Sequence, residues 1–114
     1  MSKDLTISVL MDFYGDLLTE KQRDTLDLYY NKDYSLAEIA EDLDISRQGV
    51  RDFIKRGEKQ LHDFENVLKM EERFNLITKE AEDIELLINQ INSVNVIEKK
   101  TKILEKLEKI KKAL

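Results

Sequence analysis

The sequence contains no cysteine, no proline and only three glycines among its 114 residues. Without cysteine there can be no disulfide framework, no thiolate metal site and no cysteine nucleophile. The lack of proline, together with 38% charged and 41% apolar residues, favours helices with charged surfaces over sheets. We therefore predict an all-α fold, and the length allows one compact domain with an extension.

Long apolar runs are also missing, at the N-terminus and elsewhere, so we expect neither a signal peptide nor a membrane span and place the protein in the cytoplasm. A net charge of −5 argues against a general polyanion binder held by its overall field. The sequence offers no glycine-rich phosphate loop and no catalytic constellation. We predict no enzyme, no cofactor and no metal site.

Two features could suggest ligand chemistry but have simpler interpretations. The single histidine, His62, lacks nearby partners for a general-base or metal role, and we expect it at the surface. The acidic residues Glu80, Glu82, Asp83 and Glu85 occupy nearly consecutive helix positions, which do not converge on one ion. We expect them to form a solvated helix face.

The first third of the chain predicts two helices. Apolar residues recur at helical spacing over residues 7–14, and a capping box over residues 19–22 begins a second helix. That helix should end near Asn31, a residue that tolerates the left-handed conformation of a helix stop. Tyr29 and Tyr30 could stack on single-stranded nucleic acid, but their spacing favours packing against the core.

A helix-turn-helix is predicted at residues 36–60. Ser35 and Glu38 form a second capping box, and Ser46 can cap a further helix. Val50 and Ile54 begin an apolar stripe that would face inward along that helix. Two helices joined by so short a turn have the packing of a helix-turn-helix.

The outward face of the second helix carries the candidate site. Its residues after the cap are Arg47, Gln48, Arg51, Asp52, Lys55, Arg56 and Lys59. Arg47, Gln48 and Arg51 could reach base edges in a major groove, while Lys55, Arg56 and Lys59 could neutralise phosphates. An ordinary solvated face is the alternative, and Asp52 with the acidic residues at 41, 42 and 44 would repel phosphate.

The C-terminal part, residues 66–114, predicts a helical hairpin that follows a helix-turn-helix domain at residues 1–65. Two apolar stripes in steps of four and three should meet in a coiled-coil-like seam, which could also join two copies. A break at residues 92–95 separates the stripes. Their members are Ile77, Ala81, Ile84, Ile88 and Ile91, then Val96, Ile103, Leu107, Ile110 and Leu114, with Lys100 at the seam position that lacks an apolar residue.

The order of residues in the first half resembles the bacterial YlxM family, closely over residues 9–61. The matching strings are Phe13-Tyr14, Leu17-Leu18-Thr19, Lys21-Gln22, Leu28-Tyr29-Tyr30, Ser35-Leu36, Glu38-Ile39-Ala40, Ser46-Arg47-Gln48 and Ile54-Lys55-Arg56. The resemblance implies a fold similar to region four of bacterial sigma factors followed by long helices. It also implies a DNA-binding regulatory role and a link to the signal recognition particle pathway through gene neighbourhood.

The resemblance also implies roles for single residues. Ser46, Arg47, Gln48, Arg51 and Lys55 occupy the family's recognition-helix positions, and Lys55-Arg56 its basic pair. Phe53 departs from the pattern, since the family commonly has an asparagine there, and we expect its ring to pack against the hairpin or a second subunit.

Two functional hypotheses stay open. In the first, the chain is a helix-turn-helix regulator that binds DNA as a homodimer joined through the hairpin. In the second, it is an adaptor that contacts signal recognition particle protein or RNA, with the lysines at 99, 100, 102 and 106 meeting RNA backbone. An enzyme is the least supported reading.

Overall fold

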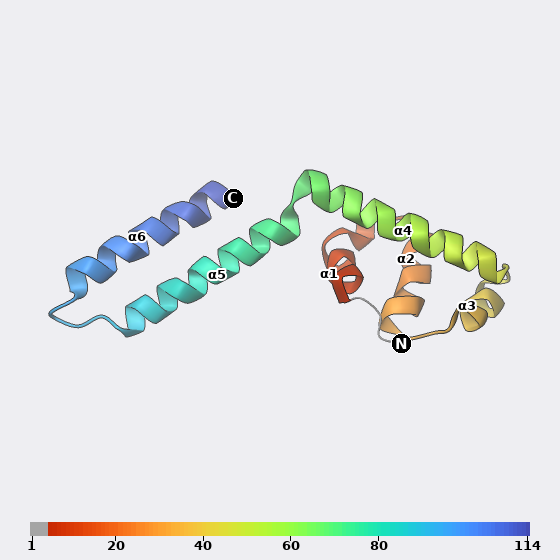
Figure 1. Ribbon diagram of the computed structural model, residues 1–114, viewed down its shortest axis with the longest axis horizontal. Coiled ribbons are helices and arrows are strands. Elements are labelled where there is room, and N and C mark those ends of the chain that lie inside the picture. Colours follow the sequence, from red (N-terminus) through yellow and green to blue (C-terminus); the bar gives the residue numbers. More distant parts are fainter. Residues whose placement is uncertain (1–4) are drawn as a thin grey trace. The chain divides into compact units, whose positions relative to one another are not determined.

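A computed structural model describes residues 5–114, and all regular structure in that range is helical (Figure 1). The predicted all-α fold is confirmed. The chain divides into two compact units, Met1–Lys69 and Met70–Leu114. The elements are α1 (Leu5–Tyr14), a 3-10 turn η1 (Gly15–Leu17), α2 (Glu20–Leu26), a π turn η2 (Asp27–Asn31), α3 (Leu36–Leu43), α4 (Arg47–Leu68), α5 (Met70–Asn89) and α6 (Val96–Ala113).

The helix-turn-helix forms where capping chemistry predicted it. The Ser35 hydroxyl accepts from the Glu38 N–H at 3.1 Å, and a Glu38 carboxylate oxygen accepts from the Ser35 N–H at 3.2 Å. Asp44 ends α3 in the left-handed conformation, with φ of 54°. The Ser46 hydroxyl then accepts from the Gly49 N–H at 3.0 Å and starts α4. These local bonds set α3 and α4 at an angle across a short turn.

Two predictions around α2 need correction. The Thr19 hydroxyl accepts from the Gln22 N–H at 3.2 Å, but Gln22 does not reach back. Its side chain is buried, and its Oε1 atom has no hydrogen-bond partner among residues 5–114. Asn31 does end the second helix, yet the left-handed residue is Asp33, with φ of 57°. A bond from Asn31 Nδ2 to Asp27 Oδ1, at 2.8 Å, holds Asn31 within the wider π turn instead.

Helix α4 is the element that completes the core of the first unit. It contacts α1, α2 and α3 (Figure 1), and its Val50, Ile54 and Leu61 are buried, as the apolar stripe predicted. Gly57 lies on the same side because a Cβ atom there would come within 2.6 Å of Leu26 Cδ1. The glycine therefore allows α2 and α4 to approach more closely than any other residue would.

Two tyrosine hydroxyls fix α4 against the rest of the unit. Tyr14 is fully buried, and its hydroxyl donates to Glu65 Oε1 at 2.5 Å. The Tyr30 hydroxyl donates to Glu58 Oε1. Because the two bonds lie about two helical turns apart on α4, they restrict rotation of this helix about its own axis.

In the second unit, α5 and α6 lie side by side as an antiparallel hairpin (Figure 1), which confirms that prediction. Residues 90–95 connect them. The Asn92 side-chain oxygen accepts from the N–H groups of Val94 and Asn95, both at 2.9 Å, and so closes the turn. Asparagine commonly supplies such bonds to its own backbone in turns.

The line along which α5 and α6 touch differs from the predicted seam. Ile77, Ile84, Ile103 and Ile110 are half-buried as expected, but other stripe members are not. Ala81, Ile88, Leu107 and Lys100 are exposed, whereas the covered positions include Glu80, Leu87, Lys99 and Lys106. The predicted seam is therefore right at the four isoleucines and wrong at the positions between them, on both helices.

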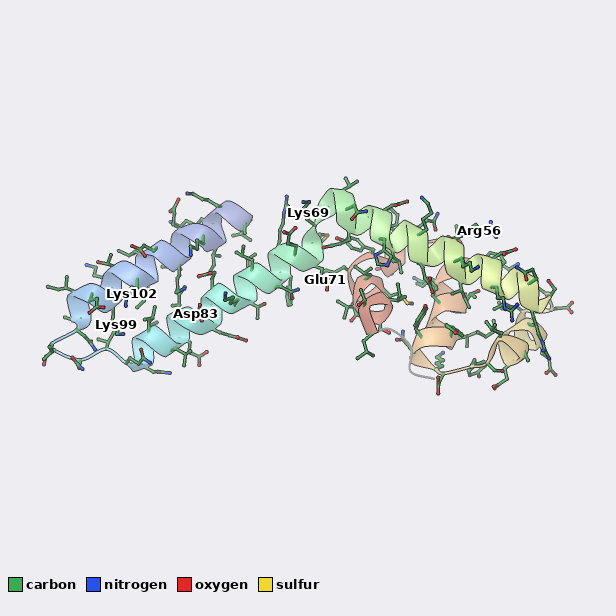
Figure 2. The ribbon with its side chains drawn as sticks, viewed as in Figure 1. Arg56, Lys69, Glu71, Asp83, Lys99 and Lys102 are labelled. Carbon is green, nitrogen blue, oxygen red and sulfur yellow. The ribbon has the colours of Figure 1, made fainter. Side chains whose placement is uncertain are left out.

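An ion group on the contact line accounts for this difference. Lys106 Nζ lies 3.2 Å from Glu80 Oε2 and 3.1 Å from Asp83 Oδ2, and Asp83 is labelled in Figure 2. Glu80 is only 7% exposed, so part of the acidic run is not the solvated face that the sequence suggested. Hydrogen bonds to Asp83 and then Glu80 raise the pKa of the Lys106 ammonium above its usual range.

Candidate nucleic-acid interface

The residues proposed from sequence to bind nucleic acid extend from the cap of α4 to just past the middle of the helix, and all are exposed. They are Ser46, Arg47, Gln48, Arg51, Lys55, Arg56 and Lys59. Arg56 is labelled in Figure 2, where it lies on the side of α4 that faces away from α1, α2 and α3. The burial of Val50 and Ile54 on the opposite side sets this orientation.

Three of these cationic side chains are available to bind an anionic ligand. Arg47, Arg51 and Lys55 make no hydrogen bond or ion pair with any residue in the range 5–114. The first turn of α4 contains no acidic residue, and its N–H groups give that end of the helix a partial positive charge. Anionic groups are therefore attracted to the N-terminal half of α4.

The remaining members of the face have weak partners. Gln48 Nε2 donates to Asp52 Oδ1 at 3.1 Å, and Lys59 Nζ lies 2.9 Å from Asp63 Oδ2. Exposed contacts of this kind contribute about 0–1 kcal/mol, so a phosphate or base edge can replace them. Asp52, which appeared from sequence only to repel phosphate, also holds the Gln48 amide in place.

Phe53 has two cationic neighbours in its own unit. Its half-buried ring lies 5.3 Å from Lys21 Nζ and 5.0 Å from Arg56 Cζ, measured to the ring centroid. Cation–π contacts of this kind hold the guanidinium of Arg56 beside the other residues of α4 that are proposed to bind nucleic acid. Packing of Phe53 against the hairpin or a second subunit stays a prediction.

An open groove that the sequence did not reveal lies beside the cationic residues. It has a volume of about 450 Å³ and is lined by Tyr29, Tyr30, Leu36, Arg51, Ile54, Lys55 and Glu58. The two tyrosines are half-buried against the core and meet edge to face at 5.0 Å. Pairing of Tyr30 with Glu58 depends on the π turn, which no local sequence pattern announces.

The surroundings limit how the face can be used. Glu41, Asp42 and Asp44 are exposed at the end of α3 and in the turn, so a polyanion must approach from the α4 side. His62 is exposed further along α4. Residues 5–114 contain no group of side chains arranged to hold a metal ion, and none of their helices is long and apolar enough to span a bilayer.

Comparison with known proteins identifies the family. A family model described as "Putative helix-turn-helix protein, YlxM / p13 like", UPF0122, matches residues 1–113. The chain belongs to this family. The resemblance to YlxM proteins drawn from the residues is thereby confirmed, and so is the helix-turn-helix class.

Relatives of similar length carry the same family name. A UPF0122 protein of Clostridium perfringens is 44% identical over 110 residues, which cover 96% of this chain and 97% of the relative. One of Clostridium kluyveri is 45% identical over 109 residues, or 95% of this chain and 94% of the relative. One of Thermoanaerobacter is 43% identical over 106 residues, or 93% and 88%.

Proposed function

We propose that this protein is a DNA-binding regulatory protein of the cytoplasm. The observation that carries the proposal is the start of α4, where Arg47, Arg51 and Lys55 project outward without internal partners from the second helix of a helix-turn-helix. This arrangement matches what a recognition helix needs in a major groove. A non-enzymatic role agrees with membership of a helix-turn-helix family.

On DNA, the first two turns of α4 would lie in the major groove. Arg47 and Arg51 suit guanine edges, and Gln48 suits an adenine edge once it exchanges Asp52 for the base. The Ser46 oxygen caps α4, and its hydroxyl hydrogen can still donate to a phosphate. Phosphates on either side would meet Lys55, Arg56 and Lys59.

Two copies would have to act together. The net charge of −5 opposes approach to DNA, and one motif with a few phosphate contacts binds weakly at physiological salt. A homodimer bound to two half-sites gains affinity by avidity without any new type of contact.

The test is fluorescence anisotropy with labelled genomic DNA fragments across a salt series. Arg47→Ala/Arg51→Ala should weaken binding at least tenfold, because each base contact contributes about 1–3 kcal/mol. The control Lys109→Ala/Lys112→Ala removes the same charge from exposed positions on α6 and should retain most of the affinity. Equal weakening by both variants would show that α4 does not read DNA.

A second candidate is an adaptor that contacts signal recognition particle protein or RNA. The negative net charge favours contact with particle protein over contact with nucleic acid. Of its four proposed lysines, Lys102 pairs with Glu98 at 3.1 Å, Lys106 joins the ion group, and Lys99 bonds Gln90 at 3.4 Å. Lys100 is the one of these four lysines with no partner among residues 5–114, so it is the one available to bind RNA. Binding of particle RNA that Lys100→Ala reduces and Arg47→Ala/Arg51→Ala does not would support this candidate over the first.

A further inference from the structure

The hairpin leaves half of an apolar stripe uncovered on each of its helices. On α5 the members turned away from α6 are Ala81 and Ile88, and Ile88 is 54% exposed. On α6, Val96, Leu107 and Leu114 are exposed in the same way.

The two uncovered stripes lie on the same face of the hairpin. Ala81 and Ile88 directly follow the covered residues Glu80 and Leu87, and Leu107 directly follows Lys106. Each stripe is therefore turned by about 100° from the contact line in the direction of increasing residue number. Since the helices are antiparallel, equal turns of this sense bring both stripes to one side. That side is called the apolar face below.

This hairpin has no apolar core of its own. Within Met70–Leu114, the one residue that is buried is Glu80, and no apolar side chain is. A unit of this size without buried apolar side chains lacks the burial that offsets the loss of chain entropy on folding. The unit therefore needs a partner that buries the apolar face in order to be stable.

We propose that a second copy of this chain covers the apolar face, so that two hairpins form a four-helix bundle. The charges of the helices point to this occupant. Helix α5 carries six acidic and two basic residues, and α6 carries three acidic and seven basic ones. The second copy offers an acidic helix and a basic helix with the same apolar spacing. A two-fold axis parallel to the helices places each α5 beside the partner copy's α6.

One ion pair across this interface can be named. Glu85 and Lys100 are exposed, have no partner among residues 5–114, and follow the covered residues Ile84 and Lys99 on the side of the apolar face. The contact of Lys106 with Asp83 sets the relative height of the helices. At a rise of about 1.5 Å per residue, Glu85 lies about four residues, or about 6 Å along the axis, from the height of Lys100 in the partner copy, a difference that the long side chains can span.

Sedimentation or light scattering of the full chain without nucleic acid tests the bundle. The wild type should be a dimer, and Ile88→Asp should be a monomer. Leu86→Asp is the matched control, because Leu86 is 59% exposed, close to the 54% of Ile88, and lies two residues away on the opposite side of α5, outside the apolar face. It should remain a dimer. A monomeric wild type, or equal loss of the dimer in both variants, would overturn the proposal.

Charge exchange tests the pairing of α5 with the partner copy's α6, even if the aspartate variants unfold. Glu85→Lys and Lys100→Glu should each weaken the dimer by roughly threefold to tenfold, and the double exchange should restore it. Failure of restoration would refute this pairing. The bundle rests on the proposed function, because it supplies the homodimer proposed there. The two can fail separately: a monomer that still binds DNA through Arg47 and Arg51 would refute the bundle but not DNA binding.

Discussion

Replacing Gly57 with alanine should destabilise the first unit although alanine is the better helix former. Alanine favours a helix by about 1 kcal/mol over glycine. Its Cβ atom, however, would lie 2.6 Å from Leu26 Cδ1 and 3.2 Å from Leu26 Cγ, where ordinary contacts are about 3.5–4.0 Å. Leu26 is fully buried, so it cannot move aside freely. Overpacking of this kind costs about 1–3 kcal/mol, which leaves a net loss of about 1 kcal/mol.

In a protein that already carries Leu26→Ala, the substitution Gly57→Ala should stabilise the first unit instead of destabilising it. Leu26→Ala alone should cost about 2–5 kcal/mol because it opens a cavity. It also removes the methyl groups that the new Cβ atom meets, so adding Gly57→Ala to it should recover up to about 1 kcal/mol. The difference in free energy of unfolding between Gln60→Gly and Gln60→Ala, at an exposed position of the same helix, measures the helix preference of alanine over glycine without any effect of packing.

Urea denaturation followed by tyrosine fluorescence suits this experiment. All four tyrosines lie in the first unit, at positions 14, 29, 30 and 34, and the chain has no tryptophan. The signal therefore reports the unit that contains Gly57. If Gly57→Ala alone stabilises the protein by about 1 kcal/mol, the same gain as from glycine to alanine at position 60, the close approach of α2 and α4 is refuted.

Three further changes should act through single contacts. Ser46→Ala should lower the stability of the first unit by about 1 kcal/mol through loss of the α4 cap, and Ser46→Asn should not, as urea denaturation would show. Tyr14→Phe should cost about 1–3 kcal/mol because it removes the bond from a buried hydroxyl to the Glu65 carboxylate, while Tyr34→Phe measures the effect of removing a tyrosine hydroxyl elsewhere in the unit. Because the pKa of Lys106 is raised above its ordinary value of 10.5, its ion pairs stabilise the hairpin below about pH 10.5 and cease to do so as the pH rises through the pKa of the folded protein. Circular dichroism should therefore show that wild type and Lys106→Gln differ at neutral pH and converge in strong alkali.

Features that depend on neighbouring residues could be predicted from the sequence. The caps at Ser35 and Ser46 need only the next three residues, and the inward positions of Val50 and Ile54 follow from helical spacing alone. The same spacing indicated which residues of α4 are exposed. Contacts between these exposed residues, such as Gln48 with Asp52, were also within reach, because the two are four positions apart.

Features that depend on distant residues were not predictable in this way. Tyr14 and its acceptor Glu65 are 51 positions apart, and the need for Gly57 lies in Leu26 on another helix. On the hairpin, periodicity located the stripes but could not tell which part of each would face the neighbouring helix. That choice depended on Lys106 meeting Glu80 and Asp83, a contact 23–26 positions apart in the chain.

The central place of α4 in the first unit also has a consequence for the order of folding during synthesis. Ile7, Leu10 and Tyr14 share a core with Leu61, so the first three helices have little to pack against until residue 61 has left the ribosome. The apolar side chains of α1 and α2 therefore stay accessible to chaperones for most of that interval. The hairpin behaves differently, because each of its helices meets the other soon after it emerges.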